Sequence, residues 1–479
     1  MSYGCQKGML MSQCDISSAY LQSELDEDIF MVPPPDMWID GKPPVDAEGN
    51  ELCLKLQRGL YGLRQGAYLW SKTFKEFILG EEMGFVEMTG DTNVYLKRFK
   101  LNGRDEELVI GQYVDDSLIL ASSSEARQWL MERLGKRFPI NASSSGEISF
   151  EEPGLLLGMN VRYSRTEGIL QFDQRQAIER LAQKLGVTSL PPRTLPIAPD
   201  SDLPKLKAAE VEVNKYLSIL GSCLHITQVS RPDIAFAVGL LSRHAATPGE
   251  VHLRAALDLV KYLYSTRHMY IQYKRDMSAD GGNIPQVFGK GWKDDRTIEE
   301  RLVATTPDVS AAAPTTFVDA DHGGEKDTKR STSGLVVMMN GGPVTWFSRL
   351  QKLTALSSAE SEIFAVVDAA KEALHIRLLC EEMGVRPLGK PMRIYEDNTA
   401  CIQMGHSLRG SNSARHFQLR LRFLHERIRD GEIEFAKVDT KEQLADGCTK
   451  ALPLPAFLIF RGAMLKGDEQ VAAAGGAKK

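Results

Sequence analysis

The pattern of apolar and polar positions predicts two folded regions in this chain, each mixing helices with strands. In the first region, two apolar, β-prone runs within 108–121 flank a Val-Asp-Asp sequence, which predicts a β-hairpin with two carboxylates at its tip. Apolar residues at helical spacing predict a helix over 68–79, and the serines at 122–124 are typical of the cap of a second helix, 125–137. We therefore expect an antiparallel sheet with helices in this region.

The middle of the chain is predicted to be mainly helical. Residues 154–161 and 169–172 are typical of a short β pair, and a helix is expected over 174–185. A proline-rich connector over 191–204 precedes the stretch 211–266, which is strongly helical apart from two breaks at prolines.

A linker and a second patterned region follow. Residues 275–314 carry few apolar anchors, which indicates a linker or a loose insertion. Beyond it, the order strand, hairpin, helix, strand, helix, helix, strand, helix predicts a mixed sheet with helices packed on it. The expected elements are a strand over 316–320, a hairpin over 334–347, a helix over 358–383, a strand over 393–396 followed by a helix, a helix over 412–430, a strand over 432–438, and a last helix that is capped by Thr440 and Gln443 and ends near 452.

Composition narrows the class of protein. The 479 residues are 43% apolar and 25% charged, as in ordinary globular proteins, and the net charge of −5 gives no overall basic field for nucleic acid, so any such binding must rest on local patches. Seven cysteines without a Cys-x-x-Cys motif argue against a disulfide framework or zinc ribbon and favour a reducing, intracellular compartment. Residues 1–15 lack a basic start followed by an apolar stretch, so we expect no signal peptide, and no apolar run reaches about 18 residues.

Carboxylates recur at the ends of predicted strands. In the first region these are Asp15, Asp115 and Asp116. If their strands are neighbours, the three carboxylates converge, and such a cluster needs cations, for which Mg²⁺ is the hard ion that prefers oxygen ligands. The alternative is a solvated Asp pair at an ordinary turn, because Asp is a favoured turn residue.

The second region repeats this arrangement. Asp319 and Asp397 end predicted strands, Glu362 lies early in the long helix, and Asp446 lies in the last helix. Helical periodicity does not choose between Glu360 and Glu362, although Glu360 would be explained by a capping box with Ser357. The alternative interpretation is that all of these are surface acids in ordinary positions.

Several sequence motifs occur in an order that resembles one known family, the reverse transcriptase–ribonuclease H part of copia-type LTR retrotransposon Pol polyproteins. The resemblance covers nearly the whole chain. The motifs are Cys14-Asp-Ile-Ser-Ser-Ala-Tyr-Leu21, Glu24-Leu-Asp-Glu-Asp-Ile-Phe-Met31, Leu60-Tyr-Gly-Leu-Arg-Gln65, Tyr113-Val-Asp-Asp116, Leu157-Gly158, Ser230-Arg-Pro-Asp-Ile-Ala-Phe-Ala-Val238, Leu241-Ser-Arg243, Asp319-Ala-Asp321, Arg330-Ser-Thr-Ser-Gly334, Ser357-Ser-Ala-Glu-Ser-Glu362, Asp397-Asn398 and Gln443-Leu-Ala-Asp-Gly-Cys-Thr-Lys450.

The resemblance implies a role for individual residues. Polymerase metal ligands would be Asp15, Asp115 and Asp116, and ribonuclease H metal ligands would be Asp319, Glu362, Asp397 and Asp446, each set binding two Mg²⁺ ions, with Mn²⁺ as an alternative. Tyr20 resembles the aromatic gate that excludes a ribose 2′-hydroxyl, and Gly62 resembles a template-contacting loop. The expected substrate-binding residues are Tyr20, Gly62, Gln65, Tyr113 and His416, the last as a loop histidine that assists turnover; residues 154–161 resemble the primer-gripping hairpin.

The chain also departs from the family pattern. Gly66-Ala67 replaces the usual Ala-Pro, His322 replaces a Trp, and Arg415-His-Phe-Gln-Leu419 replaces Lys-His-Ile-Asp-Ile. None of these changes removes an expected metal ligand. Only fourteen residues precede Asp15, where the family has a fingers subdomain, so we expect an N-terminally truncated copy.

The resemblance implies a multidomain α+β and α/β fold, in which an antiparallel palm sheet with helices and a helical thumb/connection precede a ribonuclease H-like mixed sheet. Expected parts are a palm with truncated fingers (1–165), a thumb/connection (166–270), a linker or insertion (271–314), a ribonuclease H-like domain (315–465) and a disordered tail (466–479).

The activity implied is RNA-directed DNA synthesis with cleavage of RNA in RNA–DNA hybrids. Expected partners are an RNA template, a DNA primer, the hybrid and dNTPs, and the expected location is a cytoplasmic virus-like particle or the nucleus. Two alternatives stay open: an inactive nucleic-acid-binding remnant, and a nuclease active only through its ribonuclease H domain.

Overall fold

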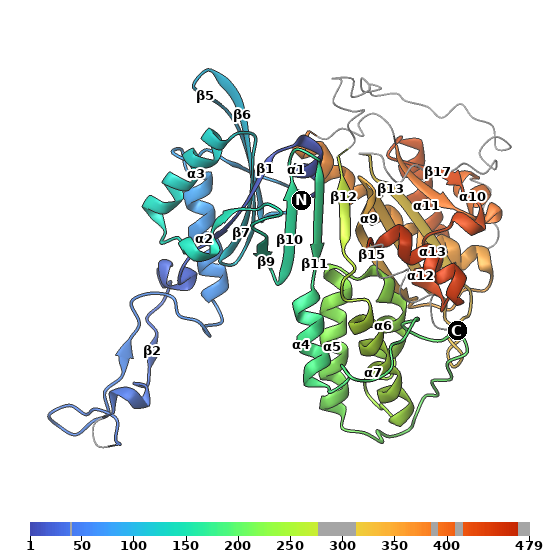
Figure 1. Ribbon diagram of the computed structural model, residues 1–479, viewed down its shortest axis with the longest axis horizontal. Helices are drawn as coiled ribbons and strands as arrows, with labels where there is room; N and C mark the ends of the chain where they lie inside the picture. Colours follow the sequence, from blue (N-terminus) through green and yellow to red (C-terminus); the bar gives the residue numbers. More distant parts are fainter. Residues whose placement is uncertain (39–40, 276–312, 385–390, 408–414, 468–479) are drawn as a thin grey trace. The chain divides into compact units, whose positions relative to one another are not determined.

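The computed structural model describes residues 1–38, 41–275, 313–384, 391–407 and 415–467. The chain forms two compact units (Figure 1). One unit is Met9–Ile148, and the other joins Met1–Gly8 to Ser149–Lys479. The first boundary therefore lies at Ser149 and not at 165, and the first eight residues belong to the second unit.

The unit Met9–Ile148 is built on a six-stranded antiparallel sheet with strand order β4-β5-β6-β7-β1-β8. The predicted hairpin at 108–121 is confirmed as part of β6 and β7. Helices α2 and α3 pack on one face of this sheet around Trp70, Phe74 and Phe138. The elements are β1 (Leu10–Asp15), η1 (Ala19–Gln22), β2 (Phe30–Met31), η2 (Pro35–Met37), β3 (Leu54–Lys55), α2 (Gly66–Leu79), β4 (Val86–Glu87), β5 (Val94–Leu101), β6 (Arg104–Tyr113), β7 (Asp116–Ala121), α3 (Ser124–Arg137), η3 (Ala142–Ser144) and β8 (Gly146–Glu147).

The second unit begins with a four-stranded antiparallel sheet, ordered β12-β11-β10-β9, and a set of helices. The predicted breaks in the helical stretch are confirmed, because α5 ends before Pro232 and α7 begins after Pro248. The elements are α1 (Ser2–Lys7), β9 (Gly154–Leu156), β10 (Met159–Ser164), β11 (Ile169–Asp173), α4 (Arg175–Lys184), α5 (Val213–Val229), η4 (Pro232–Ile234), α6 (Ala235–Ser242), α7 (Glu250–Ser265) and β12 (Ile271–Lys274).

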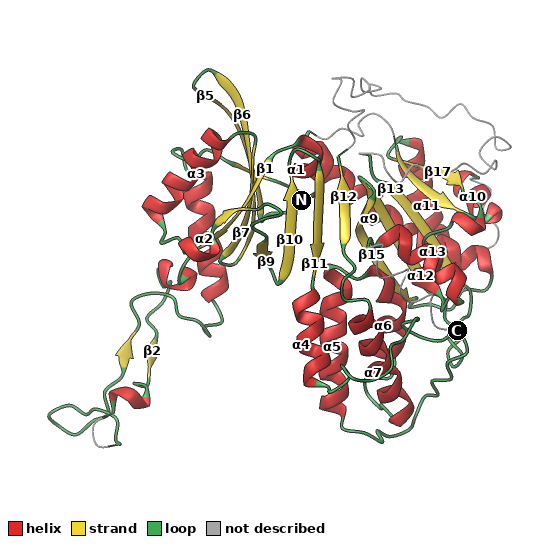
Figure 2. Ribbon diagram, viewed as in Figure 1, coloured by secondary structure: helices red, strands yellow, loops and turns green. Residues whose placement is uncertain are grey.

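A five-stranded mixed sheet completes this unit, with strand order β15-β14-β13-β16-β17. Strands β13, β14 and β15 are antiparallel, whereas β16 runs parallel to both β13 and β17. Helix α9 lies against this sheet (Figure 2), and its apolar side chains share a core cluster with residues of β13 and β14. The elements are β13 (Thr315–Asp321), β14 (Thr332–Met339), β15 (Gly342–Leu350), α9 (Ser358–Met383), β16 (Met392–Glu396), α10 (Thr399–His406), α11 (Arg415–Arg429), β17 (Ile433–Lys437), η6 (Thr440–Glu442), α12 (Asp446–Thr449) and α13 (Leu454–Met464).

The expected fold class is confirmed, but some predicted boundaries are wrong. Strand β12 lies inside the predicted linker 271–314, because it pairs with β11. Lys466 pairs with Tyr270, so the predicted tail starts as ordered chain. Residues 276–312 and 468–479 lie outside the described residues.

The last predicted helix, 440–452, is also wrong. The structure has a short 3₁₀ turn, the four-residue helix α12 and then α13, which begins at Leu454. Pro453 lies between α12 and α13, and it is the N-cap of α13. None of the described helices is long and apolar enough to span a membrane.

Candidate metal centres

The hairpin between β6 and β7 carries Asp115 and Asp116 at one end of the sheet, where Asp15 also lies. Asp15 ends β1 and lies directly opposite Asp116, the first residue of β7. Asp115 occupies the two-residue turn of the hairpin, and its carbonyl accepts a hydrogen bond from the Ile16 N–H at 3.0 Å. Strand pairing therefore brings three acids from distant parts of the sequence to one end of the sheet.

The Asp15 carboxylate is held in place by neighbouring polar side chains. Its Oδ2 accepts hydrogen bonds from Asn141 Nδ2 at 3.0 Å and from the Ser144 hydroxyl. The Asp15 main-chain N–H donates to Ser145 Oγ at 2.9 Å. These contacts orient a half-buried carboxylate that would otherwise be free to rotate.

Val114, at the tip of the hairpin, has an uncommon backbone conformation. Its φ is 55°, in the left-handed region that β-branched residues rarely adopt. The carbonyl of Val114 accepts a hydrogen bond from Trp70 Nε1 at 2.5 Å and another from the Gln112 side chain. The buried Trp70 thus helps hold the strained turn that carries Asp115, and residue pattern alone carried no signal for this.

An aromatic pair lies near these acids. The Tyr20 and Tyr61 ring centroids are 4.5 Å apart. Burial, and then the charge of Asp115, raise the pKa of the Tyr61 phenol, which places this ring close to the acidic end of the sheet. Tyr61 was not among the predicted site residues, although it lies within the Leu60–Gln65 motif.

The other expected polymerase residues lie as follows. Gly62 has φ of +100°, and nothing lies within 4 Å of a Cβ added there, so its backbone conformation rather than lack of space favours glycine. Gln65 precedes α2 and donates to Glu27 Oε1 at 3.1 Å. Tyr113 is 64% exposed, and it pairs with Asp116 across the hairpin.

A tighter acidic cluster lies on the mixed sheet. Asp319 on β13, Glu362 on α9 and Asp397 after β16 each offer a ligand atom within 4.8 Å of the others. The parallel pairing of β13 and β16 explains this, because parallel neighbours end at the same edge of a sheet. Among the residues that the structure describes, these three acids are the group whose side chains lie close enough to bind one metal ion together.

The two candidate glutamates of α9 have different surroundings. The Glu360 N–H donates to Ser357 Oγ at 3.2 Å, and its carboxylate accepts from the Leu356 N–H at 2.8 Å. Glu360 therefore caps the helix, although its side chain reaches Leu356 rather than the expected Ser357. Glu362 is 5% exposed and belongs to the acidic cluster.

Burial and mutual repulsion dominate the electrostatics of this cluster. Burial, and then the Asp446 charge, raise the pKa of Asp319 to about 7. Burial, and then the charges of Glu396 and Asp319, raise the pKa of Glu362 well above its usual range. Glu362 Oε2 is buried without a hydrogen-bond partner. An unpaired buried oxygen among carboxylates fits the ligand set of a hard divalent cation.

Asp446 and His416 lie outside this cluster of three. Asp446 begins α12, and Lys450 Nζ donates to its carboxylate at 2.9 Å. The hydroxyl of Thr449, on the same short helix, donates to Asp319, so α12 lies beside the cluster. His416 lies in the first turn of α11, but its side chain is outside the described residues.

Glu396 is a buried acid that the motifs did not single out. It is fully buried at the end of β16, and its Oε1 accepts from the Asn398 N–H at 2.8 Å. Its Oε2 has no hydrogen-bond partner, and burial raises its pKa well above the usual range. Period-two alternation from Ile394 could have shown that this side chain faces the core.

Comparisons with known proteins agree with the motifs. A family model described as reverse transcriptase (RNA-dependent DNA polymerase) matches residues 1–199. The Pol polyprotein from transposon TNT 1-94 of Nicotiana tabacum is 26% identical over 468 residues, which is 96% of this chain and 31% of that protein. The Pol polyprotein from transposon RE1 of Arabidopsis thaliana is 28% identical over 450 residues, 94% of this chain and 27% of that protein. The chain is therefore similar over most of its length to retrotransposon Pol polyproteins.

The chain thus spans about a third or less of the length of these relatives. Among solved structures, a foamy viral protease–reverse transcriptase in complex with double-stranded DNA covers 92% of this chain and 59% of that chain, with 11% identity and a TM-score of 0.44. LC11-RNase H1, isolated from compost, covers 29% of this chain and 93% of that chain, with 10% identity and a TM-score of 0.23. Overall agreement with both is low, and the site assignments rest on the residues of this chain.

Proposed function

We propose that this chain is an RNA-directed DNA polymerase that also cleaves the RNA strand of RNA–DNA hybrids. The observation that carries the proposal is the convergence of Asp319, Glu362 and Asp397 at one edge of the mixed sheet. The family match over residues 1–199 and the acids of the hairpin support the polymerase part. The proposed division is a palm, a helical thumb/connection and a ribonuclease H-like domain.

In the proposed ribonuclease centre, Asp319, Glu362, Asp397 and Asp446 hold Mg²⁺ or Mn²⁺. Bound ions would supply an activated water and stabilise the leaving oxygen of an RNA phosphate. The chain's own residues keep the ligands oriented, since the Thr449 hydroxyl donates to Asp319 and Lys450 holds Asp446. His416 is proposed to assist turnover.

Cleavage of a labelled RNA–DNA hybrid in Mg²⁺ tests this proposal. We expect Glu362→Gln to lower the cleavage rate by at least about a hundredfold, because removal of one charged ligand weakens both metal binding and transition-state stabilisation. Glu360→Gln is the matched control, because it removes a charge on the same helix while keeping the acceptor of the helix cap. Equal cleavage by wild type and Glu362→Gln would contradict the proposal.

In the proposed polymerase centre, Asp15, Asp115 and Asp116 hold the ions. Tyr20 is proposed to exclude a ribose 2′-hydroxyl, and Gly62, Gln65 and Tyr113 are proposed to contact template, primer or dNTP. The order along Tyr113–Asp116 and the pairing of Asp15 with Asp116 support this arrangement.

Primer extension on an RNA template tests the polymerase centre. We expect Asp115→Asn to abolish whatever dNTP incorporation the wild type shows. Asp105→Asn, an exposed acid on the same hairpin, is the control and should incorporate dNTPs at the wild-type rate. If Asp115→Asn still incorporates dNTPs, Asp115 is not a ligand of the polymerase centre.

A nuclease active only through the ribonuclease centre is the second candidate. One observation favours it: the cluster on the mixed sheet brings three ligand atoms within 4.8 Å, whereas among the described residues the hairpin acids form no such group. Metal titration separates either enzyme from a binding remnant, because cleavage requires Mg²⁺ whereas salt-dependent hybrid binding does not.

A further inference from the structure

Two arginines of the motifs around residues 230–243 have no role in the proposed centres. Arg231 precedes η4, and Arg243 directly follows α6. Both lie in the helical part of the second unit; Arg231 is fully buried, whereas Arg243 is half-buried. Their surroundings differ, and the difference suggests a function for one of them.

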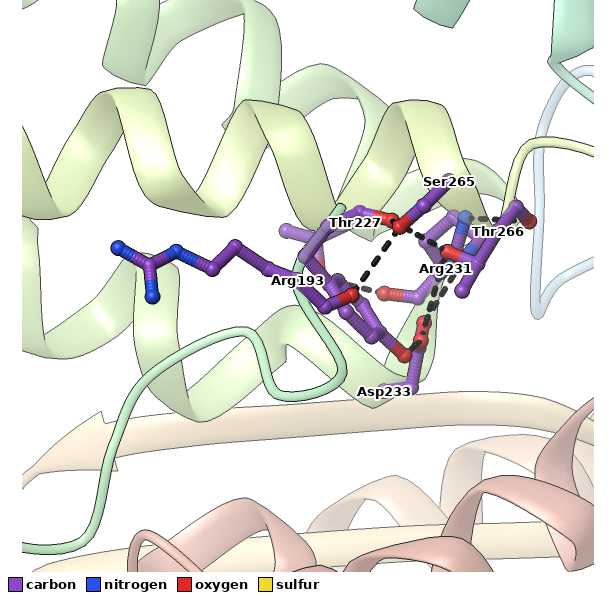
Figure 3. A network of polar contacts seen from close by, with 7 residues as sticks. Arg193, Thr227, Arg231, Asp233, Ser265 and Thr266 are labelled. Carbon is purple, nitrogen blue, oxygen red and sulfur yellow. Dashed lines mark hydrogen bonds and ion pairs between the residues drawn. The ribbon is translucent and has the colours of Figure 1, made fainter. Parts of the chain in front are cut away.

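Arg231 has partners for its guanidinium within the protein. Its Nε and one terminal nitrogen donate to the two oxygens of Asp233 at 2.8 and 2.7 Å, and its terminal nitrogens also donate to Thr266 (Figure 3). The Tyr262 hydroxyl donates to Asp233 at 2.5 Å. A buried ion pair with its donors and acceptors satisfied is a structural element.

Arg243 lacks such compensation. One terminal nitrogen donates to Thr332 Oγ1 at 3.0 Å, while its Nε is buried without a hydrogen-bond partner. In the part of the chain that the structure describes, Arg243 forms no ion pair within 4.0 Å. Glu325, one of the nearest acids, uses its carboxylate for the N–H and hydroxyl of Thr328. A guanidinium with an unmet donor is costly inside a protein unless a ligand completes its shell.

The position of Arg243 puts it beside the ribonuclease centre. Its partner Thr332 on β14 lies directly opposite Asp321 on β13. Asp321 is two residues beyond Asp319, so both project from the same face of the strand. Lys450 and Arg243 both counteract the rise in the pKa of Asp321 that burial causes, so the two cations lie near this strand end.

We propose that Arg243 binds a backbone phosphate of the RNA–DNA hybrid and positions the hybrid at the acidic centre. A guanidinium suits this role because its planar fork matches phosphate oxygens in a bidentate manner. The residue comes from the helical region and not from the mixed sheet, so hybrid binding depends on both. This inference rests on the proposed ribonuclease function.

Hybrid binding in EDTA, without cleavage, tests the inference in the full chain. A short fluorescein-labelled RNA–DNA hybrid is titrated with protein at several salt concentrations. We expect Arg243→Gln to bind the hybrid about tenfold more weakly, because a hydrogen bond to a charged group is lost. The slope of log K against log salt should fall by about one, since one phosphate contact is removed.

Two further variants separate phosphate binding from a structural role. Arg254→Gln removes an equal charge from the exposed surface of α7 and should keep the wild-type affinity and slope. Arg243→Lys keeps the charge without the fork, so it should keep the slope and lose part of the affinity.

If the slope of log K against log salt is the same for Arg243→Gln as for Arg254→Gln, the inference is overturned and the ribonuclease proposal stays intact. A lowered melting temperature with an unchanged slope would also overturn it, because the role would then be structural. Failure of the wild type to bind hybrid at all would overturn both proposals.

Discussion

Glu360 and Glu362 lie two residues apart on α9, and burial separates their roles. Glu360 reaches back to the exposed start of the helix, where its carboxylate accepts a main-chain N–H. Glu362 faces the sheet, with one carboxylate oxygen buried and unpartnered among other acids. A carboxylate in that position destabilises the metal-free protein, because burial and neighbouring acids both disfavour its charge.

Replacement of Glu362 should therefore stabilise the metal-free protein. The folded-state pKa of Glu362 lies above its unfolded value. The free-energy cost of the Glu362 charge in the folded protein is therefore absent at low pH and grows as pH rises through the raised pKa. We expect Glu362→Gln in EDTA at about pH 8 to be more stable than wild type by at least about 1 kcal/mol. The difference should vanish near pH 4, below the unfolded pKa.

Denaturant unfolding at the two pH values measures this difference, with Glu360→Gln as the control. Glu360, which is half-buried and lies outside the acidic cluster, should show no comparable gain. Equal stability of wild type and Glu362→Gln at the higher pH would mean that the folded protein does not penalise the Glu362 charge.

Metal binding to the same centre should depend on pH. The pKa of Asp319 is raised to about 7, so a fraction of its carboxyl groups carries a proton at neutral pH. An ion must displace that proton, and its apparent affinity should rise between about pH 6 and pH 8. Calorimetric Mn²⁺ titration in buffers of different ionisation enthalpy would count the protons released. Mn²⁺ binding without proton release would contradict the raised pKa of Asp319.

At the scale of the elements, the break between α5 and α6 depends on a buried polar network. Pro232 interrupts the helical pattern, but the chain around it is held by side chains from other elements (Figure 3). The Thr227 hydroxyl donates to the Arg231 carbonyl, and the Arg231 guanidinium joins Asp233 to Thr266 after α7. The network therefore connects the end of α5 to the end of α7.

Loss of Arg231 should destabilise the second unit strongly. We expect Arg231→Met to cost about 3–5 kcal/mol, because it leaves the buried Asp233 carboxylate without its cation. Arg193→Met is the matched control: its side chain pairs with Asp258 in a partly exposed position and should cost less than about 1 kcal/mol. Urea unfolding measures both, and similar losses for the two variants would contradict the assigned role of the network.

At the scale of the whole molecule, each of the two units has a hydrophobic core cluster of its own. Phe138 packs with Trp70 and Phe74 in the unit Met9–Ile148, and Phe435 is buried with α9 in the second unit. Multi-unit proteins commonly unfold in more than one step. We expect urea unfolding of the full chain to show two transitions.

Core variants should assign these transitions. Phe138→Ala and Phe435→Ala should each cost about 3–5 kcal/mol, and each should shift a different transition. Mn²⁺ should shift chiefly the transition that Phe435→Ala lowers, because ligands stabilise the unit that binds them. A single transition shifted by both variants would show instead that the two units unfold together.

Local features were predictable from the sequence because they depend on neighbours along the chain. Helical periodicity and capping residues placed α3 and α9 closely, and Ser123 and Ser357 cap them as expected. The motifs also identified the acids of the cluster on the mixed sheet. The end of the chain was less predictable, because one helix over 440–452 was predicted where the structure has a 3₁₀ turn and the four-residue helix α12.

Only the tertiary structure decided which side chains meet. The first eight residues belong to the second unit because α1 contacts β11 and β12, far away in sequence. Tyr61 and Arg243 became candidates only when strand pairing and helix packing brought them beside the acids. Periodicity reports which face of an element is buried, whereas convergence depends on contacts between elements that no local pattern encodes. The sequence thus determined the elements and the acids, and the fold determined which acids gather and which arginine lies next to them.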